Sequence, residues 1–256
     1  MNADEQVSYR VVNGVAWLTI NRPQARNALN AVVRQGLFDG FARFNDDDSA
    51  RVLVLTGAGD VAFSAGADLK EMADTGLAVP PPDFLPQLGR NVHVDKPTIA
   101  AVNGVAYAGG FLLAQTCDLV VAAENTVFKY PEAQVGFTGG LIASAAARLP
   151  HKIAMEFMLL GQDLSAQRAY EVGMVNQVVP NGTQREAAMA YARILVRSAP
   201  LVVETLKRFS LETLNKSPAE AAALARQQLL LVRDSEDGAE GRQAFAQKRP
   251  PTFKGR

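Results

Sequence analysis

The stretch TIAAVNGVAYAGGFLLAQTCDLVVAAE (residues 98–124) decides the fold of this chain. TIAAV (98–102) is a continuous apolar run short enough for a buried strand, and DLVVAAE (118–124) has the composition of another. Between these two runs, the Gly109-Gly110 turn opens an apolar helix. A strand, a helix and a strand in this order are typical of α/β proteins that contain a parallel sheet.

Residues 98–117 carry no charge and approach the length of a membrane-spanning helix. Asn103 and Gln115 interrupt this run and Asp118 follows it at once, so a buried strand, a turn and a helix are favoured instead. Cys117 is the only cysteine, so no disulfide can form within the chain, which suits a reducing cytoplasm. The 26 basic and 26 acidic residues balance, so neither nucleic acid nor an anionic membrane is an expected partner.

The N-terminal part of the chain adds further strands and helices. Apolar and polar residues alternate over 7–11, and Asn13-Gly14 supplies a type I′ turn into AWLTI (16–20), which predicts a β-hairpin. Residues 28–45 have the periodicity of an amphipathic helix, and VLVLTG (52–57) predicts a buried strand. The overall pattern is a β-β-α unit that repeats without readable sequence repeats.

The C-terminal part differs, because strands alternate with helices only as far as VNQVV (175–179). Ser217-Pro218-Ala219-Glu220 (217–220) has the spacing of a helix capping box, and Ser235 is placed to cap the last helix. We therefore expect an α/β body over residues 1–182 and a helical C-terminal region over 183–256.

Two turns combine small residues with the start of a helix: Gly66-Ala67-Asp68 (66–68) and Ala108-Gly109-Gly110 (108–110). Small residues let a ligand approach the backbone, and the free N–H groups at a helix start attract negative charge. If one N–H group from each turn points at the same place, the pair forms an oxyanion hole. The alternative, which is favoured for either turn taken alone, is that the small residues only allow close packing of turns in a crowded α/β core.

Glu132 follows Pro131 and a strand-like segment, TVFKY (126–130). A carboxyl group buried among apolar neighbours has a raised pKa, as a group that takes and returns protons requires. The alternative is an exposed glutamate in a turn. The apolar neighbours in sequence are Val127, Phe128, Tyr130, Val135 and Phe137.

A serine hydrolase is a second possibility to consider, because AFSAG (62–66) nearly matches the nucleophile elbow G-x-S-x-G. Ser64, Asp118 and His151 also occur in the order that such enzymes use. The first glycine of the elbow is missing, however, and the acid and histidine come too early in the chain. No metal site is expected, because His93 and His151 are too few and too far apart in sequence.

Taken together, these segments resemble the enoyl-CoA hydratase/isomerase (crotonase) family over nearly the whole chain. The segments occur in the order and spacing of the family, and six of them in register make a specific signal. They are NRPQARNAL (21–29), FSAGADLKEM (63–72), the NG…AGG turn (103–110), PE (131–132), LSAQRAYEVGMVNQVV (164–179) and EGRQAFAQKRPP (240–251).

The resemblance implies a fold of ββα units wound into a spiral, followed by helices that assemble homotrimers or hexamers. It implies an acyl-CoA thioester as substrate, with the N–H groups of Ala67 and Gly109 on its carbonyl oxygen and Glu132 as general acid and base. No separate cofactor is implied, because the CoA is part of the substrate. The residues that the resemblance places along the CoA are Gln24, Ala25, Arg26, Ala65, Asp68, Leu69, Phe245 and Lys248.

The chain departs from the family at Leu112, because hydratases of the family carry a second glutamate at this place. Hydration needs a water positioned at one carbon and a proton delivered to the next. One carboxyl group suffices to move a proton between two carbons, so isomerisation of 3-enoyl-CoA to 2-enoyl-CoA is favoured over hydration. Hydration by Glu132 alone, a second acid from loop 74–95 such as Asp83, and acyl-CoA binding without turnover remain alternatives.

Overall fold

The computed structural model describes residues 5–77, 80–136, 149–213 and 216–256. Among these residues, a six-stranded sheet has the order β1-β2-β3-β5-β7-β10. The first two strands form the expected antiparallel hairpin, in which Asn13 and Gly14 both have positive φ, and the other neighbours are parallel. Its strands are β1 (Val7–Val12), β2 (Val15–Ile20), β3 (Val52–Gly57), β5 (Thr98–Val102), β7 (Leu119–Ala123) and β10 (Gln177–Val179).

A smaller sheet of short strands accounts for the repeating ββα pattern. In the described parts of the chain its order is β4-β6-β8-β9, and only β9 runs antiparallel to its neighbour. The strands of the β1-β2 hairpin both belong to the large sheet. Each of the next units, β3-β4, β5-β6 and β7-β8, gives its first strand to the large sheet and its second to the small sheet, and then continues into a helix. This arrangement confirms the predicted spiral α/β fold. The strands are β4 (Ala62–Ser64), β6 (Val105–Tyr107), β8 (Val127–Lys129) and β9 (Leu164–Ser165).

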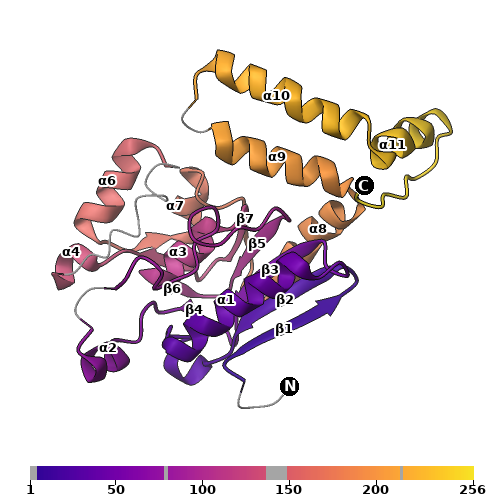
Figure 1. The fold of residues 1–256 in the computed structure, drawn as a ribbon. Helices are drawn as coiled ribbons and strands as arrows, with labels where there is room; N and C mark the ends of the chain where they lie inside the picture. Colours follow the sequence, from indigo (N-terminus) through magenta and orange to yellow (C-terminus); the bar gives the residue numbers. More distant parts are fainter. Residues whose placement is uncertain (1–4, 78–79, 137–148, 214–215) are drawn as a thin grey trace.

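Helices cover both faces of the large sheet (Figure 1). One face carries the main apolar core, on which α1 and α3 pack, and the other is covered by α8, whose Ala188 and Ala192 contact the strands. The helices up to α8 are α1 (Ala31–Asp46), α2 (Leu69–Thr75), α3 (Gly109–Thr116), α4 (Glu132–Val135), α6 (His151–Leu160), α7 (Ala166–Glu171) and α8 (Gln184–Arg197), with a short 3-10 helix η1 at Pro23–Ala25.

Helix α1 begins three residues later than the sequence predicts. The side chain of Asn30 accepts a hydrogen bond from the Val33 N–H group at 3.0 Å and so caps the helix. Leu29, within the predicted helix, instead pairs with Ala67 in an isolated parallel bridge. The misplaced start has a simple cause, because apolar periodicity does not distinguish Leu29 of the bridge from the first helical turn.

After β10 the described chain is helical, as expected. Helices α9 (Pro200–Thr213), α10 (Pro218–Arg233) and α11 (Glu236–Ala246) extend away from the sheets (Figure 1). The capping box at Ser217 and the cap at Ser235 are both present. Since α8 packs on the sheet itself, the extension proper is α9 to α11. Among the described residues, no helix is both long and apolar enough to cross a membrane.

Candidate active site

A cavity of about 390 Å³ lies where the two glycine-bearing turns meet the start of α4. Most of its wall is apolar. Its described lining residues are Ala65, Ala67, Leu69, Met72, Pro80, Phe84, Leu85, Tyr107, Ala108, Gly109, Leu112, Tyr130, Pro131, Glu132 and Val135. Ala67, Gly109 and Glu132, the three catalytic candidates of the sequence analysis, all line this cavity.

The two turns are in close contact, as glycine at both allows. Gly66 has φ +89°, and a Cβ atom there would lie 2.8 Å from the carbonyl oxygen of Tyr107 and 3.0 Å from Cβ of Ala108. Gly110 is packed against the backbone of Ser64 in the same way. Close packing of the turns is thus real, and it brings Ala67 and Gly109 to the same cavity.

The backbone N–H groups of Ala67 and Gly109 make no hydrogen bond to any other described residue. Gly109 is the first residue of α3, where helix geometry leaves the N–H group without a partner. The preceding Ala108 has φ +49°, a region that favours glycine, and its N–H group donates to the Lys129 carbonyl oxygen at 2.8 Å. A free N–H group at a helix start is suited to bind an oxygen that carries negative charge.

Glu132 is buried, and its side chain belongs to the wall of the same cavity. The residue is 8% exposed, and its Oε2 atom has no hydrogen-bond partner among the described residues. Burial raises the pKa of this carboxyl group to about 7, because removal from water disfavours the ionised form. The predicted burial is confirmed, and the alternative of an exposed turn glutamate is wrong.

Leu112 lies in α3, is 2% exposed and lines the cavity together with Glu132. Of the described lining residues, Glu132 is the one that carries a carboxyl group. Asp83 is exposed and does not belong to the described wall, although its neighbour Phe84 does. A second acid from loop 74–95 therefore has no support in this arrangement.

Part of the expected CoA-binding set lies at the cavity. Ala65 and Leu69 line it, and the N–H group of Ala65 donates to the carbonyl oxygen of Arg26 at 3.0 Å. This bond joins the segment Gln24-Ala25-Arg26 to the cavity wall. Leu69 is largely exposed, as a residue at the mouth of a binding site is.

Three other residues of the expected CoA-binding set lie away from the cavity or have other partners. The carboxylate of Asp68 pairs with Arg22 at 3.0 Å and caps α2, and its pKa is lowered chiefly by the hydrogen bond from Arg22. Phe245 and Lys248 are exposed at the end of α11, at the opposite end of the molecule from α2 (Figure 1). Within one chain, these two residues do not reach the cavity.

Sequence reasoning missed several residues of the wall. Met72, Phe84 and Leu85 form part of its apolar surface, and Tyr107 lines it as well. Phe84 and Leu85 come from loop 74–95, in which no periodicity singles them out.

The hydrolase interpretation is wrong, because the three side chains have other environments. Ser64 is fully buried, and its hydroxyl group accepts a hydrogen bond from the N–H group of Gly66. Asp118 binds Thr98 and forms an ion pair with Lys207 at 2.9 Å. His151 is exposed at the start of α6.

The fold is a spiral of ββα units in which two free N–H groups and one buried carboxyl group line a common cavity. A sequence model of the enoyl-CoA hydratase/isomerase family matches residues 10–256. The chain belongs to this family.

Individual relatives agree. The chain is 41% identical over 249 residues to a carnitinyl-CoA dehydratase from Salmonella heidelberg, covering 93% of this chain and 94% of that one. An enoyl-CoA hydratase structure from Mycobacterium tuberculosis superposes with a TM-score of 0.91 at 38% identity, covering 99% and 100% of the two chains. An enoyl-CoA hydratase structure from Mycobacterium marinum superposes with a TM-score of 0.90 at 37% identity, with the same coverage of the two chains. The chain is therefore an enzyme of the hydratase/isomerase family, which argues against binding without turnover.

Proposed function

We propose that Glu132 is the single general acid and base of this enzyme, and that the N–H groups of Ala67 and Gly109 bind the thioester carbonyl oxygen. Removing a proton next to a thioester leaves an enolate, whose negative charge collects on that oxygen. Two fixed donors stabilise this charge without reorganising, which contributes roughly 3 kcal/mol per donor in comparable sites. No redox change occurs, so the proposal requires no cofactor beyond the CoA of the substrate.

The observation that carries the proposal is the state of Glu132. Its Oε2 atom has no described partner, and its pKa of about 7 lets it both accept and return a proton near neutral pH. The two free N–H groups line the same cavity. An acid, an unoccupied pair of donors and an apolar pocket are the parts that proton transfer on an acyl thioester needs.

Within this chemistry, we favour the isomerisation of 3-enoyl-CoA to 2-enoyl-CoA. Glu132 takes the proton from Cα, and the electron pair of the Cα–H bond moves into the thioester carbonyl to give a dienolate. When the carboxyl group returns the proton at Cγ, the carbonyl re-forms and the double bond shifts from Cβ=Cγ to Cα=Cβ. One carboxyl group is enough for this sequence. Leu112 supplies no acid and no hydrogen bond to hold a water at Cβ.

Hydration and dehydration form the second candidate, and the names of the relatives favour it. A carnitinyl-CoA dehydratase and two enoyl-CoA hydratases are among the proteins to which the chain is similar. In this case Glu132 alone would activate the water and protonate Cα.

An assay with two substrates separates these candidates. Wild-type enzyme is offered 2-enoyl-CoA and 3-enoyl-CoA separately, and the absorbance of the conjugated thioester is followed. A gain with 3-enoyl-CoA that exceeds the loss with 2-enoyl-CoA supports isomerisation, and the reverse supports hydration.

The Glu132→Gln variant tests the assignment of the acid and base. Glutamine has nearly the same size but cannot exchange protons, so we expect either activity to fall by at least about 100-fold. Binding of a CoA thioester, measured by calorimetry, is the control and should change little. Full activity of Glu132→Gln with both substrates would show that another group moves the proton.

A further inference from the structure

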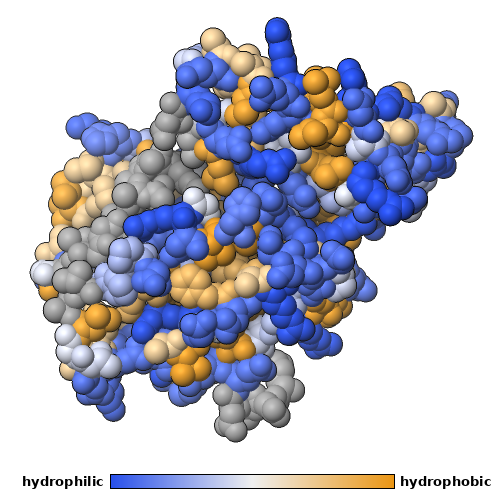
Figure 2. All heavy atoms as spheres, in the orientation of Figure 1, coloured by the Kyte–Doolittle hydropathy of each residue, from blue (hydrophilic) through white to orange (hydrophobic). Residues whose placement is uncertain are grey.

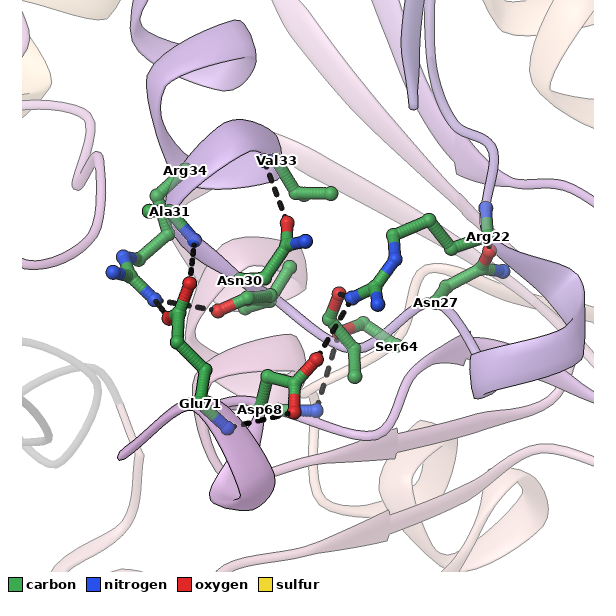
Figure 3. Close-up of polar contacts among 12 residues, drawn as sticks. Arg22, Asn27, Asn30, Ala31, Val33, Arg34, Ser64, Asp68 and Glu71 are labelled. Carbon is green, nitrogen blue, oxygen red and sulfur yellow. Dashed lines mark hydrogen bonds and ion pairs between the residues drawn. The ribbon is translucent and has the colours of Figure 1, made fainter. Parts of the chain in front are cut away.

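Arg34 on α1 belongs to a polar network that also contains Ala31 and Glu71 (Figure 3). One of its guanidinium nitrogens donates to the carbonyl oxygen of Leu29 at 2.8 Å and to Oε2 of Glu71 at 2.7 Å. The other carboxylate oxygen of Glu71 accepts the N–H group of Ala31 at 2.7 Å. The arginine side chain is only 15% exposed, so water screens these contacts less than on an open surface.

These contacts surround the turn that contains Ala67. Leu29 pairs with Ala67 in the isolated parallel bridge, and its N–H group donates to the carbonyl oxygen of Gly66 at 2.8 Å. Glu71 lies in the first turn of α2, which begins directly after Asp68. Arg34 thus holds the backbone on one side of Ala67 through Leu29 and the helix on the other side through Glu71.

The same guanidinium group also contacts the wall of the cavity. Its central carbon lies 4.1 Å from the centre of the Phe84 ring, a close cation–π contact. Phe84 is buried and lines the cavity next to Leu85, whose side chain packs against Gly109. Arg34 is therefore in contact with both the apolar wall and the supports of the Ala67 turn.

We propose that Arg34 is a positioning residue that couples the Phe84 wall of the acyl pocket to the Ala67 N–H group. An acyl chain that packs against Phe84 fixes the ring, the ring fixes the guanidinium plane, and the guanidinium group fixes the turn. The inference rests on the proposed function, because it concerns the aim of one of the two donors. It predicts that Arg34 affects turnover more than it affects substrate binding.

The test compares kcat, KM and Tm for wild type, Arg34→Met, Arg34→Lys and a matched control. Arg185→Met is the control, because the Arg185 guanidinium group stacks on Trp17 at 4.4 Å and Arg185 is not part of the cavity wall. We expect Arg34→Met to lower kcat by about 10- to 100-fold with a small change in KM, as for a misplaced catalytic group. Arg34→Lys keeps the charge for Glu71 and should recover part of the loss, whereas Arg185→Met should retain kcat.

A double-mutant cycle with Phe84→Leu tests the coupling itself. Because Phe84→Leu removes the stacked ring, Arg34→Met should lower kcat by a smaller factor in the Phe84→Leu background than in wild type. The effects of the two substitutions on kcat are then not additive. Additive effects would overturn the coupling. The apparent pKa of kcat/KM should stay the same in Arg34→Met, since Glu132 is not among the contacts of Arg34.

The outcomes separate this inference from the proposed function. Wild-type kcat in Arg34→Met, or an equal loss in Arg185→Met, overturns the role of Arg34. If this occurs while Glu132→Gln is inactive, the proposed function stands and only the coupling fails. Activity in Glu132→Gln overturns the proposed function instead. Should Arg34→Met fail to fold, Arg34→Lys decides: an unchanged kcat overturns the proposal, and a lowered kcat at unchanged KM and Tm supports it.

Discussion

At the residue scale, Glu132 has a carboxyl group that can ionise, and its burial opposes that ionisation. Its pKa in the folded chain, about 7, lies above the ordinary value of 4.5. The folded state therefore binds the proton more tightly than the unfolded state does. The stability contribution is fully present below pH 4.5 and is lost as the pH rises through about 7.

The first prediction is a pair of opposite pH dependences. The free energy of unfolding of wild type should fall, relative to Glu132→Gln, by up to about 3 kcal/mol as the pH rises from about 4.5 to about 7. Over the same interval kcat/KM should rise, because the ionised carboxylate is the base. Denaturant titrations and initial rates check the two halves. A kcat/KM profile that is flat from about pH 5 to about pH 8 would contradict the role of Glu132.

The second prediction concerns Leu112, which faces the same cavity. Leu112→Glu places a second carboxyl group near Glu132, and we expect hydration of 2-enoyl-CoA to rise by about tenfold or more. Stability should fall by a few kcal/mol, because a buried acid replaces a packed leucine. Leu112→Gln has the same shape without the acid and serves as the control. Equal hydration rates for both variants would contradict this explanation of the leucine.

At the scale of elements, the contact between the two turns depends on Gly66. A Cβ atom there meets the backbone of Tyr107, and φ +89° is strained for any other residue. Gly76 caps α2 with φ +66° but has no described atom within 4 Å of an added Cβ atom. A substitution at either glycine therefore strains the backbone, but only at Gly66 does an added Cβ atom also meet neighbouring atoms.

The third prediction follows from this difference. Gly76→Ala should lower the free energy of unfolding by about 1 kcal/mol, the cost of the backbone conformation alone. Gly66→Ala should lower it by about 3 kcal/mol or more and should reduce kcat, because the turn must move away from the cavity. Chemical denaturation and turnover measurements check both. Equal stabilities would contradict the close contact of the turns.

The sequence predicted elements with a regular pattern and missed those without one. The strands of the large sheet, the capping box at Ser217 and the cap at Ser235 have local signals that do not depend on the rest of the fold. Strands β4 and β6, with three residues each, are too short for any periodicity. The start of α1 was misplaced because Leu29 is bonded to a segment far along the chain.

The candidate site was predicted to a similar extent. Glycine-bearing turns and a glutamate within an apolar segment have recognisable signatures, so the sequence alone suggests Ala67, Gly109 and Glu132, and the structure places all three at one cavity. The ion pair between Arg22 and Asp68 joins residues 46 positions apart, and nothing local indicates it. For the same reason, the sequence suggested that Asp68 contacts the CoA but gave no sign of its ion pair with Arg22.

At the scale of the whole molecule, the helical extension exposes apolar side chains (Figure 2). They include Leu206 of α9 and Leu229, Leu230 and Leu231 of α10, each at least half exposed. Phe245 is 88% exposed and far from the cavity of its own chain. These observations support the proposal that the extension packs on other copies of the chain and brings Phe245 and Lys248 to a neighbour's CoA.

The fourth prediction is therefore a solution mass of three or six times 27.4 kDa by light scattering. Phe245→Ala should raise KM for the CoA thioester by several-fold and leave KM for the shorter pantetheine thioester unchanged, because the family resemblance places Phe245 at the nucleotide end of the CoA. A monomeric mass, or an equal rise of KM for both thioesters, would contradict the contribution of a neighbouring chain.

The most direct measurement of the central claim is deuterium exchange from heavy water into the acyl chain of a bound CoA thioester. It reports on proton transfer at Cα whether the overall reaction is isomerisation or hydration. We expect wild type to incorporate deuterium at this carbon, and Glu132→Gln to incorporate at least about 100-fold less at the same occupancy. Incorporation at the wild-type rate in Glu132→Gln, or none in wild type saturated with thioester, would contradict the account.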